Sequence, residues 1–557
     1  MTSPSVPTQP LVAEVDSTFA ESNRAFARAY YLFATARLSP TYDSAAIYAQ
    51  YPLLSDRATF ESLRTLYEAD PENLITRRLF AETLGTVIGN ELAGEQDAFE
   101  NKRNDLVIDT TGLGLSQTDG TPVTGLKYED VSEYLKNTAD RPTRQALYDR
   151  FAEAHRTHLA DDFSTLFLRE AALMAGLGYG DIIAFSSRMS GHDLTHLAGL
   201  AAQLVADTQE TYTAQMGAFY HKRTGEDFAQ ATRADISYVM KGPDPDLEAI
   251  NRLFPEERMV SLAQETFDGL GLDFSGIARR ADFGSLDDYH AVVDDEAARR
   301  DRPKRILLDL TKREGKRSRA YVYPAGIPEE IYLSVKPEGG LDDYSAFFHE
   351  SGHALHFACE DPALPYALAM MGNNVATESY AYLFQNLFLN RHWLTNRAGL
   401  TPEQAKTVVN RLALNDLYML RRYAGKMQFE VLLHTGLNTE SHSLTGMGEH
   451  YAGLLTQACG YRYDAEGWTR DVDAGFYVAD YFTAWSLEAQ LRDTLARRFG
   501  DPAILGEDWY ANPQAGAFLV EVWKDGNITQ HDLCQRLGFT HPNDLNPLLR
   551  WMRHNLA

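Results

Sequence analysis

The amino-acid sequence predicts a mainly α-helical protein with one small β-sheet. Across residues 19–300, apolar residues recur at intervals of three and four, as in residues 143–175. This period places apolar side chains along one face of each helix, so the region predicts a stack of amphipathic helices. The same period returns after Leu341 and continues almost to the last residue.

The small sheet is expected just after residue 305, where β-prone segments alternate with turns that contain Gly and Pro. These segments are residues 306–310, 320–323 and 331–335. An edge strand can pair its backbone with an extended peptide. We assign that role to the third segment, with Tyr332 and Ser334 as candidate substrate-binding residues. The alternative is a β-ribbon that only packs the fold.

The composition is that of a globular protein. The chain has 557 residues, of which 44% are hydrophobic and 23% are charged, so it can bury a large core. Its formal net charge of -26 repels nucleic acid and anionic membranes. We therefore expect neither of these as a partner.

The compartment and the domain layout also follow from the sequence. Three scattered cysteines, Cys359, Cys459 and Cys534, are too few for a disulfide framework and fit a reducing compartment. No segment approaches the roughly 20 apolar residues that span a bilayer, and residues 1–10 do not look like a secretory leader. We expect a cytoplasmic protein with a disordered tail (1–18), a helical N-terminal lobe (19–300) and a catalytic lobe (301–557).

A metal-binding motif lies in the second helical region. Residues 347–356 read FFHESGHALH, which contains HExxH in an apolar, helix-compatible run. One helical turn separates His349 from His353, so both imidazoles face one side and can share a tetrahedral zinc ion. Glu350 projects toward the same side, where it can accept a proton from a zinc-bound water and act as general base.

A third ligand has to come from further along the chain. Metzincin spacing fails because Cys359 occupies the third His position, and thermolysin-like spacing fails as well. Glu360 lies two turns along the same helix, about 10 Å from His353, which is too far. Glu378 lies in a second helix-compatible segment that begins with an Asn cap. This segment can fold back on the first helix.

The predicted ligand set is therefore His349, His353 and Glu378, with one zinc ion per chain. Two imidazoles and one carboxylate leave a fourth position open for water, which is typical of a catalytic zinc site. Cobalt or manganese can substitute in the same set. His356, one turn after His353, is interpreted as a residue that packs beside or supports this set. It is also kept as a candidate for substrate binding.

The sequence around this motif resembles the oligopeptidase family of thimet oligopeptidase and oligoendopeptidase F, which belongs to the gluzincin class of HExxH zinc peptidases. The similarity rests on residues 348–356, on the interval between His353 and Glu378, and on residues 313–321, which read REGKRSRAY. Residues 330–335 and 339–343 also look like that family's substrate-pairing strand and the loop after it. The similarity covers roughly residues 305–490, and the N-terminal half matches only in being helical.

The resemblance implies a two-lobed, mostly helical shell around a deep substrate channel, with the small sheet next to the zinc-binding helices. Such a channel admits short unfolded peptides and excludes folded proteins, which implies an oligoendopeptidase. One alternative is a carboxypeptidase or dipeptidyl carboxypeptidase of the same chemistry. Another is an inactive zinc-containing protein that binds peptides. Glu350 argues against the latter, because binding alone needs no general base.

Residues 471–485 correspond to the part of the family that supplies transition-state donors. They depart from the family pattern, because Asp471 and Ala479 stand where relatives carry His and Tyr. Tyr477 and Tyr481 lie one turn apart, so both phenols can face the zinc and donate to a developing oxyanion. The segment is also similar to the related angiotensin-converting enzyme family, in which the residue aligned with Tyr481 is the catalytic donor. We favour Tyr481, and the alternative is that both tyrosines only pack between lobes.

Arg470 stands just before this segment. An arginine here can bind the terminal carboxylate of a substrate through two parallel hydrogen bonds, which would make the enzyme a carboxypeptidase. The alternative is a solvated surface residue.

Overall fold

The computed structural model describes residues 9–37, 43–117, 119–281, 283, 285–294, 305–318, 320–437 and 444–556. The chain divides into two units, each built from segments that are distant in the sequence. Unit 1 contains residues 1–87, 246–409 and 483–551, and unit 2 contains residues 88–245, 410–482 and 552–557. A boundary at residue 300, as expected from the sequence, does not separate them.

The reason is that the boundaries between the units fall inside or at the ends of helices. These helices are α4 (Leu74–Asp105), α12 (Pro245–Asn251), α21 (Pro402–Leu437), α24 (Tyr477–Phe499) and α27 (Asn546–Leu556). Apolar periodicity reveals a helix, but it does not reveal which body each half of the helix packs into.

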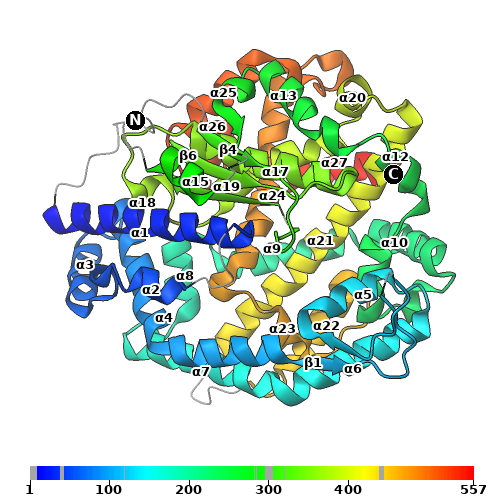
Figure 1. The fold of residues 1–557 in the computed structure, drawn as a ribbon, viewed down its shortest axis with the longest axis horizontal. Helices are drawn as coiled ribbons and strands as arrows, with labels where there is room; N and C mark the ends of the chain where they lie inside the picture. Colours follow the sequence, from blue (N-terminus) through cyan, green and yellow to red (C-terminus); the bar gives the residue numbers. More distant parts are fainter. Residues whose placement is uncertain are drawn as a thin grey trace. The chain divides into compact units, whose positions relative to one another are not determined.

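Helices dominate both units, which confirms the predicted mainly α fold (Figure 1). The other helices of unit 1 are α1 (Pro10–Ala34), α2 (Ser44–Tyr48), α3 (Arg57–Ala69), α13 (Met259–Gly269), α14 (Phe274–Ile277), α15 (Leu286–Val293), α17 (Leu341–Ala358), α18 (Tyr366–Ala369), α19 (Val375–Gln385), α20 (Arg391–Trp393), α25 (Pro513–Trp523) and α26 (Gln530–Leu537). Those of unit 2 are α5 (Val131–Asn137), α6 (Arg141–His158), α7 (Ala160–Gly176), α8 (Ile182–Ser190), α9 (Leu194–Asp207), α10 (Gln209–Thr224), α11 (Ile236–Lys241), α22 (Met447–Cys459) and α23 (Trp468–Asp471). Among the described residues, none of these helices combines the length and apolar character that crossing a bilayer requires.

The first helix begins earlier than the sequence predicted. Residues 1–8 lie outside the described residues, but α1 starts at Pro10, inside the expected tail. Val15 is fully buried, and the Asp16 carboxylate accepts hydrogen bonds from the backbone N–H groups of Tyr366 (3.0 Å) and Ala367 (2.7 Å). These contacts tie the start of α1 to α18, so the segment from residue 10 onward is ordered structure and not a tail.

Unit 1 contains the predicted sheet. Its strands are β3 (Ala278–Arg280), β4 (Ile306–Asp309), β5 (Tyr321–Gly326) and β6 (Glu330–Ser334), and they lie in the order β3-β4-β6-β5. The three expected strands are confirmed, and β3 was not predicted. Unit 2 holds a separate pair, β1 (Val107–Asp109) and β2 (Gly125–Lys127), which is antiparallel.

The expectation that residues 331–335 form an edge strand is wrong. β6 pairs in parallel with β4 on one side and antiparallel with β5 on the other, so both edges of its backbone are already used. The outer strand on this side of the sheet is β5. Three strands in chain order do not reveal their order in space, which is why the sequence pointed to the wrong one.

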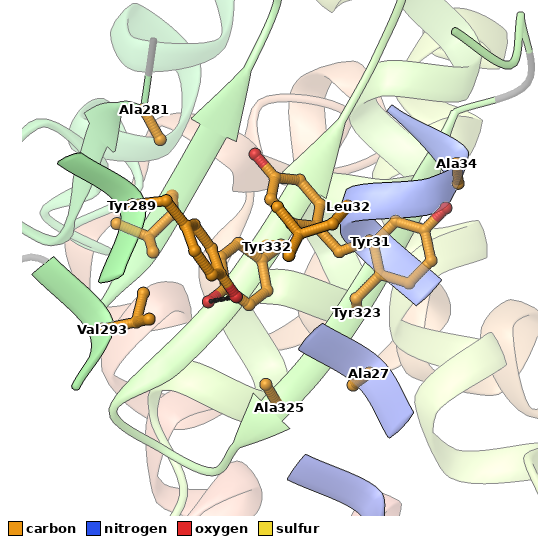
Figure 2. Packing of buried hydrophobic residues seen from close by; sticks show 11 residues of the cluster. Ala27, Tyr31, Leu32, Ala34, Ala281, Tyr289, Val293, Tyr323, Ala325 and Tyr332 are labelled. Carbon is orange, nitrogen blue, oxygen red and sulfur yellow. Dashed lines mark hydrogen bonds between the residues drawn. The ribbon is translucent and has the colours of Figure 1, made fainter. Parts of the chain in front are cut away.

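Helix α1 covers one face of this sheet with aromatic side chains (Figure 2). The rings of Tyr31 and Tyr332 stack with centroids 4.2 Å apart, and the Tyr289 and Tyr332 hydroxyl groups lie within 3.0 Å. Tyr332 is fully buried and Ser334 nearly so. Both residues therefore belong to the core, and their predicted role in substrate binding is not supported.

Candidate metal centre

The structure brings the three predicted ligands together in unit 1. His349 and His353 lie on α17, which packs against β5 and β6, and Glu378 lies in the first turn of α19. The Glu378 Oε2 atom is 3.5 Å from His349 Nε2 and 3.9 Å from His353 Nε2. One ligand atom from each residue lies within 4.8 Å of the others. A single metal ion can therefore be held by all three.

Gly352 allows α17 and α19 to approach each other closely. A Cβ atom at this position would lie 2.7 Å from the Ala381 Cα and 2.8 Å from the Tyr380 carbonyl oxygen. No side chain fits in that space. The glycine between the two histidines thus sets the distance at which Glu378 reaches them.

Thr377 orients His353. The Thr377 hydroxyl oxygen lies 2.7 Å from His353 Nδ1, so Nε2 is the nitrogen that faces Glu378. Burial, together with His349 and His356 nearby, lowers the pKa of His353 well below its usual value. The imidazole is therefore neutral at physiological pH and keeps a lone pair for a metal ion. This donor set fits a zinc ion.

An aromatic pair stands beside His349. The Tyr382 ring lies 5.2 Å from the His349 ring, and Trp485 stacks on Tyr382 with centroids 5.3 Å apart. The Ser379 hydroxyl donates to the Ala484 carbonyl oxygen at 3.2 Å. These contacts fix the part of α24 that belongs to unit 1 against α19 and the ligand cluster.

Glu350 follows His349 on α17 and is partly exposed. Burial is the main cause that raises the pKa of Tyr323, and the Glu350 carboxylate adds to this effect. The proposed general base is therefore within electrostatic reach of β5.

The outer edge of β5 offers hydrogen-bonding groups. In an antiparallel pair, alternate residues direct their backbone groups toward the partner strand and away from it. Pro324 has no N–H, and its carbonyl oxygen accepts a hydrogen bond from Asn23 Nδ2 on α1 at 2.9 Å, so it faces away from β6. By this alternation Val322, two residues earlier, directs its N–H and C=O outward as well.

His356 is a packing residue. It is fully buried, its Nε2 atom lies 3.2 Å from the Gly526 carbonyl oxygen, and its ring contacts Tyr380 with centroids 4.9 Å apart. The same nitrogen is 3.6 Å from the buried Glu360 carboxylate. The supporting role is thus the one that the geometry favours. Full burial removes His356 from the candidates for substrate binding.

Tyr477 and Tyr481 lie in the first turns of α24, in unit 2. Their rings meet edge to face with centroids 4.7 Å apart, and Tyr423 stacks on Tyr481 at 5.3 Å. Both side chains are partly exposed. Asp480, which directly precedes Tyr481, has its Oδ1 atom 2.8 Å from His192 Nε2.

Asp471 has a structural role. Its carboxylate accepts hydrogen bonds from Arg422 and from the Tyr451 hydroxyl, and it lies 3.7 Å from Lys426 Nζ. Burial acts to raise the pKa of Asp471, but Arg422 and Lys426 outweigh it and lower the value to about 2. Ala479 is fully buried. Neither position can supply a donor to a substrate.

A second ion pair also connects α21 to the segment around Asp471. Lys426 Nζ lies 2.8 Å from Asp473 Oδ2, and the Asp473 backbone N–H donates to Glu430 Oε1 at 3.0 Å. Arg422, Lys426 and Glu430 follow one another at four-residue intervals on α21. One face of α21 thus holds the turn that leads into Tyr477.

Arg470 does not present its charge to a substrate. Its guanidinium group donates to both carboxylate oxygens of Asp464, at 2.8 and 2.9 Å, and to the Tyr148 hydroxyl at 3.0 Å. The interpretation as a binding site for a terminal carboxylate is therefore not supported, because an internal carboxylate already occupies the guanidinium.

Three residues of the site were missed in the sequence. Thr377 and Tyr382 flank Glu378 on α19 at positions that helical spacing could have placed near the ligands. Gly352, between the histidines, could have signalled a close helix crossing. None of these signals is specific without the tertiary contact that gives it meaning.

The fold and this cluster are compatible with a metallopeptidase. Residues 134–379 match the model of Peptidase family M3, a region that contains His349, Glu350, His353 and Glu378. The match confirms the resemblance to this group of peptidases and implies a metallopeptidase. No curated protein matches the sequence.

Solved structures support the fold. A crystal structure described as a "putative peptidase from Chlamydophila abortus" superposes with a TM-score of 0.60, covering 98% of this chain and 89% of that chain. The sequence identity is 14%, so this likeness concerns the fold alone.

Proposed function

We propose that the protein is a zinc-dependent oligoendopeptidase that hydrolyses peptide bonds within short unfolded peptides. The observation that carries this proposal is the convergence of His349, His353 and Glu378 beside Glu350 on α17, a helix that packs against the outer strand β5. A metal site, a base and a strand edge for an extended chain are the parts that peptide hydrolysis requires.

His349, His353 and Glu378 would hold the zinc ion. When bound, zinc lowers the pKa of a coordinated water and polarises the peptide carbonyl group. The protein's own contribution begins with orientation. Thr377 fixes the His353 ring, and Gly352 sets the spacing of α17 and α19.

The outer edge of β5 is proposed as the strand that aligns the substrate. The Val322 N–H and C=O groups can pair with an extended peptide, which holds its backbone in one direction. This replaces β6 as the substrate-pairing strand. Only an unfolded segment can add to a sheet edge in this way, so short flexible peptides are the favoured substrates.

Glu350 moves the proton. Its carboxylate accepts a proton from the attacking water and then delivers it to the nitrogen of the leaving amine. Tyr481 is proposed to donate a hydrogen bond to the developing oxyanion. This assignment rests on the similarity of residues 471–485 to the angiotensin-converting enzyme family, and the partly exposed side chain of Tyr481 is compatible with it.

Cleavage within the peptide is favoured over release of C-terminal residues. A carboxypeptidase needs a cation for the terminal carboxylate, and the candidate Arg470 is paired with Asp464. Digestion of one peptide in free and amidated forms would separate the two activities. An endopeptidase cleaves both forms at the same internal bonds.

The test of the proposal uses Glu350→Gln. The zinc-loaded wild-type protein should cleave unstructured peptides of about ten residues, and the variant should bind zinc equally well but lose activity by at least about 10²-fold. Glu133→Gln, at an exposed position of α5, is the control and should be fully active. A Glu350→Gln variant with more than a few per cent of wild-type activity would remove Glu350 from its role. A zinc-loaded wild-type protein that cleaves no peptide would favour the peptide-binding alternative.

A further inference from the structure

A cavity of about 500 Å³ lies within unit 2, and none of the metal ligands lines it. Its lining residues all belong to that unit. They come from α4, α5, α6, α7, α11 and α23, and from the short segments around Tyr128 and Arg233. A volume of this size is typical of sites that bind small molecules. We call it the unit 2 cavity.

Aromatic rings form much of the wall of the unit 2 cavity. Phe99, Phe151, Phe163 and Tyr128 line it, and all four are partly exposed. The ring centroids of Tyr128 and Phe151 are 4.7 Å apart, and those of Phe99 and Phe163 are 6.3 Å apart. Partly exposed rings gain contact energy when a further ring packs on them. The walls therefore favour a flat aromatic ligand.

A chain of hydrogen bonds holds one side of the cavity in place. The Thr469 hydroxyl donates to the Glu466 carbonyl oxygen at 2.9 Å, and the same hydroxyl oxygen lies 2.7 Å from His155 Nε2. His155 Nε2 therefore donates, and His155 Nδ1 accepts from the Tyr128 hydroxyl at 2.8 Å. Burial, together with Arg470 nearby, lowers the pKa of His155 to about 3. The ring is neutral and adds no charge to the cavity.

Arg233 lines the cavity without an ion pair. Among the described residues, none forms a hydrogen bond or an ion pair with its guanidinium group, which lies 5.5 Å from the centroid of the Tyr463 ring. Burial acts to raise the pKa of Asp471, and Arg422 and Lys426 are the main causes that lower it. Arg233 contributes less to this effect, and Arg422 is the cation that contacts the carboxylate. The N–H groups of Arg233 are thus available to a bound anion.

The other charged groups of the cavity are already paired. Arg470 Nη2 donates to both carboxylate oxygens of Asp464, whereas Arg470 Nη1 is buried and has no hydrogen-bond partner within the described part of the chain. Arg103 Nη2 lies 2.6 Å from Glu100 and 3.6 Å from Glu129. These two carboxylates would repel a second negative charge on a ligand. The cavity therefore matches one carboxylate better than a doubly charged phosphate.

We propose that the unit 2 cavity binds a small molecule with a flat aromatic body and a single carboxylate. The aromatic body would pack on the rings of the wall. The carboxylate would accept hydrogen bonds from Arg233, which compensates the cost of burying an unpaired guanidinium. The proposal is independent of the proposed peptidase function, because neither the metal ligands nor Glu350 line the cavity.

The test is isothermal titration calorimetry of the zinc-loaded wild-type protein with naphthylacetate and with naphthylacetamide, its uncharged counterpart. The acid should bind once per chain with a Kd of about 1 mM or tighter, the scale for a ligand of this size. The amide should bind about 10- to 100-fold more weakly, because it forms no charge-assisted hydrogen bonds with Arg233. Arg233→Gln should abolish this difference, and Arg233→Lys should keep part of it.

Arg188→Gln is the matched control for the charge. Arg188 lies on α8 of unit 2, is partly exposed like Arg233, and does not line the cavity. Its replacement should leave both affinities unchanged. Equal binding of the acid and the amide by the wild-type protein, no binding of either, or a difference that Arg233→Gln leaves intact would overturn the proposal.

Ser132→Trp tests the location of the ligand while Arg233 stays in place. Ser132 is exposed on α5 and lines the cavity, so a bulky ring there should obstruct it and weaken binding of the acid by at least about tenfold. Glu133→Trp adds the same ring at the next position of α5, which does not line the cavity, and should bind as the wild-type protein does. Because Ser132 is exposed, this pair is informative even if Arg233→Gln folds poorly. Binding that Ser132→Trp leaves unchanged would place the acid elsewhere, for example on the metal ion, and would reject the cavity as its site.

Discussion

Single neighbouring residues fix the orientation of the metal-ligand side chains. His353 is turned toward Glu378 because the Thr377 hydroxyl contacts its other ring nitrogen. Such contacts to the outer nitrogen of a ligand histidine fix the ring and tune its basicity. The ligand identities alone do not define the site.

Thr377→Val should therefore lower zinc affinity by about 10- to 100-fold, the usual effect of removing such a partner. The overall stability should change little, because valine fills the same volume. Thr377→Ser keeps the hydroxyl and should bind zinc almost as tightly as the wild-type protein. Competition with a chromophoric chelator measures both affinities, and equal affinity in the valine variant would contradict the assigned role.

Tyr481→Phe should lower kcat by about 10² to 10³ with a much smaller change in KM, because a bond to the oxyanion strengthens only as charge develops. Tyr477→Phe should cost less, or should act mainly on KM. Steady-state kinetics on one peptide gives both values. If Tyr477→Phe is the crippled variant and Tyr481→Phe is silent, the assignment along α24 is displaced by one turn.

Helix spacing made the ligands predictable, whereas substrate contacts depended on tertiary structure. His349 and His353 follow from a four-residue period, and Glu378 follows from the absence of a nearer carboxylate at a suitable distance. Tyr332 and Ser334 were assigned to a strand edge, and the order of strands in the sheet placed them inside. The ion pair of Arg470 with Asp464, which the sequence does not reveal, argues against the predicted role of Arg470 in substrate binding.

At the scale of elements, the pairing of α17 and α19 is the critical contact. Gly352→Ala would place a Cβ atom 2.7 Å from the Ala381 Cα, and backbone cannot yield as a flexible side chain can. The helices should move apart, with a loss of about 1 to 3 kcal/mol of stability and weaker zinc binding.

Gly85→Ala is the control for that substitution. Gly85 lies within α4, and an added Cβ atom there would meet nothing within 4 Å. This variant should be as stable as the wild-type protein or more stable by about 0.5 to 1 kcal/mol. Thermal unfolding and zinc titration of the two variants measure these effects. Equal losses of stability and zinc affinity in Gly85→Ala and Gly352→Ala would contradict the assigned role of Gly352 in helix packing.

The charged residues Arg422, Lys426 and Glu430 on α21 predict a dependence of stability on pH. Burial, with Asp473 and Asp471 nearby, raises the pKa of Glu430 from 4.5 to about 8 although Lys426 opposes the change. A raised pKa in the folded state means that the stabilising contribution is complete below about pH 4.5 and is lost as pH rises through about 8. The loss should be roughly 2 to 4 kcal/mol.

Glu430→Gln should flatten this part of the stability profile, because glutamine stays neutral while its oxygen can still accept the Asp473 N–H. Urea unfolding at several pH values between about 5 and 9 measures the effect. Glu133→Gln, at an exposed position of α5, should retain the wild-type slope. Parallel profiles for the wild-type protein and Glu430→Gln would show that Glu430 does not titrate in this range.

For the whole molecule, the sequence was informative about class and weak about organisation. Periodicity gave a mainly helical fold with a small sheet, because both signals are local in the chain. The division into units was not predictable, since it depends on contacts between residues hundreds of positions apart. The role of Asp471 likewise depends on tertiary contacts, because Arg422 and Tyr451 donate hydrogen bonds to its carboxylate.

The interleaving of segments also determines when the metal-bearing helices can complete their packing during synthesis of the chain. Ribosomes produce the ligands up to Glu378 long before Gly526, whose carbonyl oxygen supports His356 on the metal-bearing helix. At about 5 to 20 residues per second, the delay is roughly 7 to 30 seconds. Throughout that interval the apolar faces of α17 and α19 lack their final cover. Nascent chains should therefore depend on chaperone protection over this stretch of translation, and the affinity for zinc should mature only after the last third of the chain has emerged.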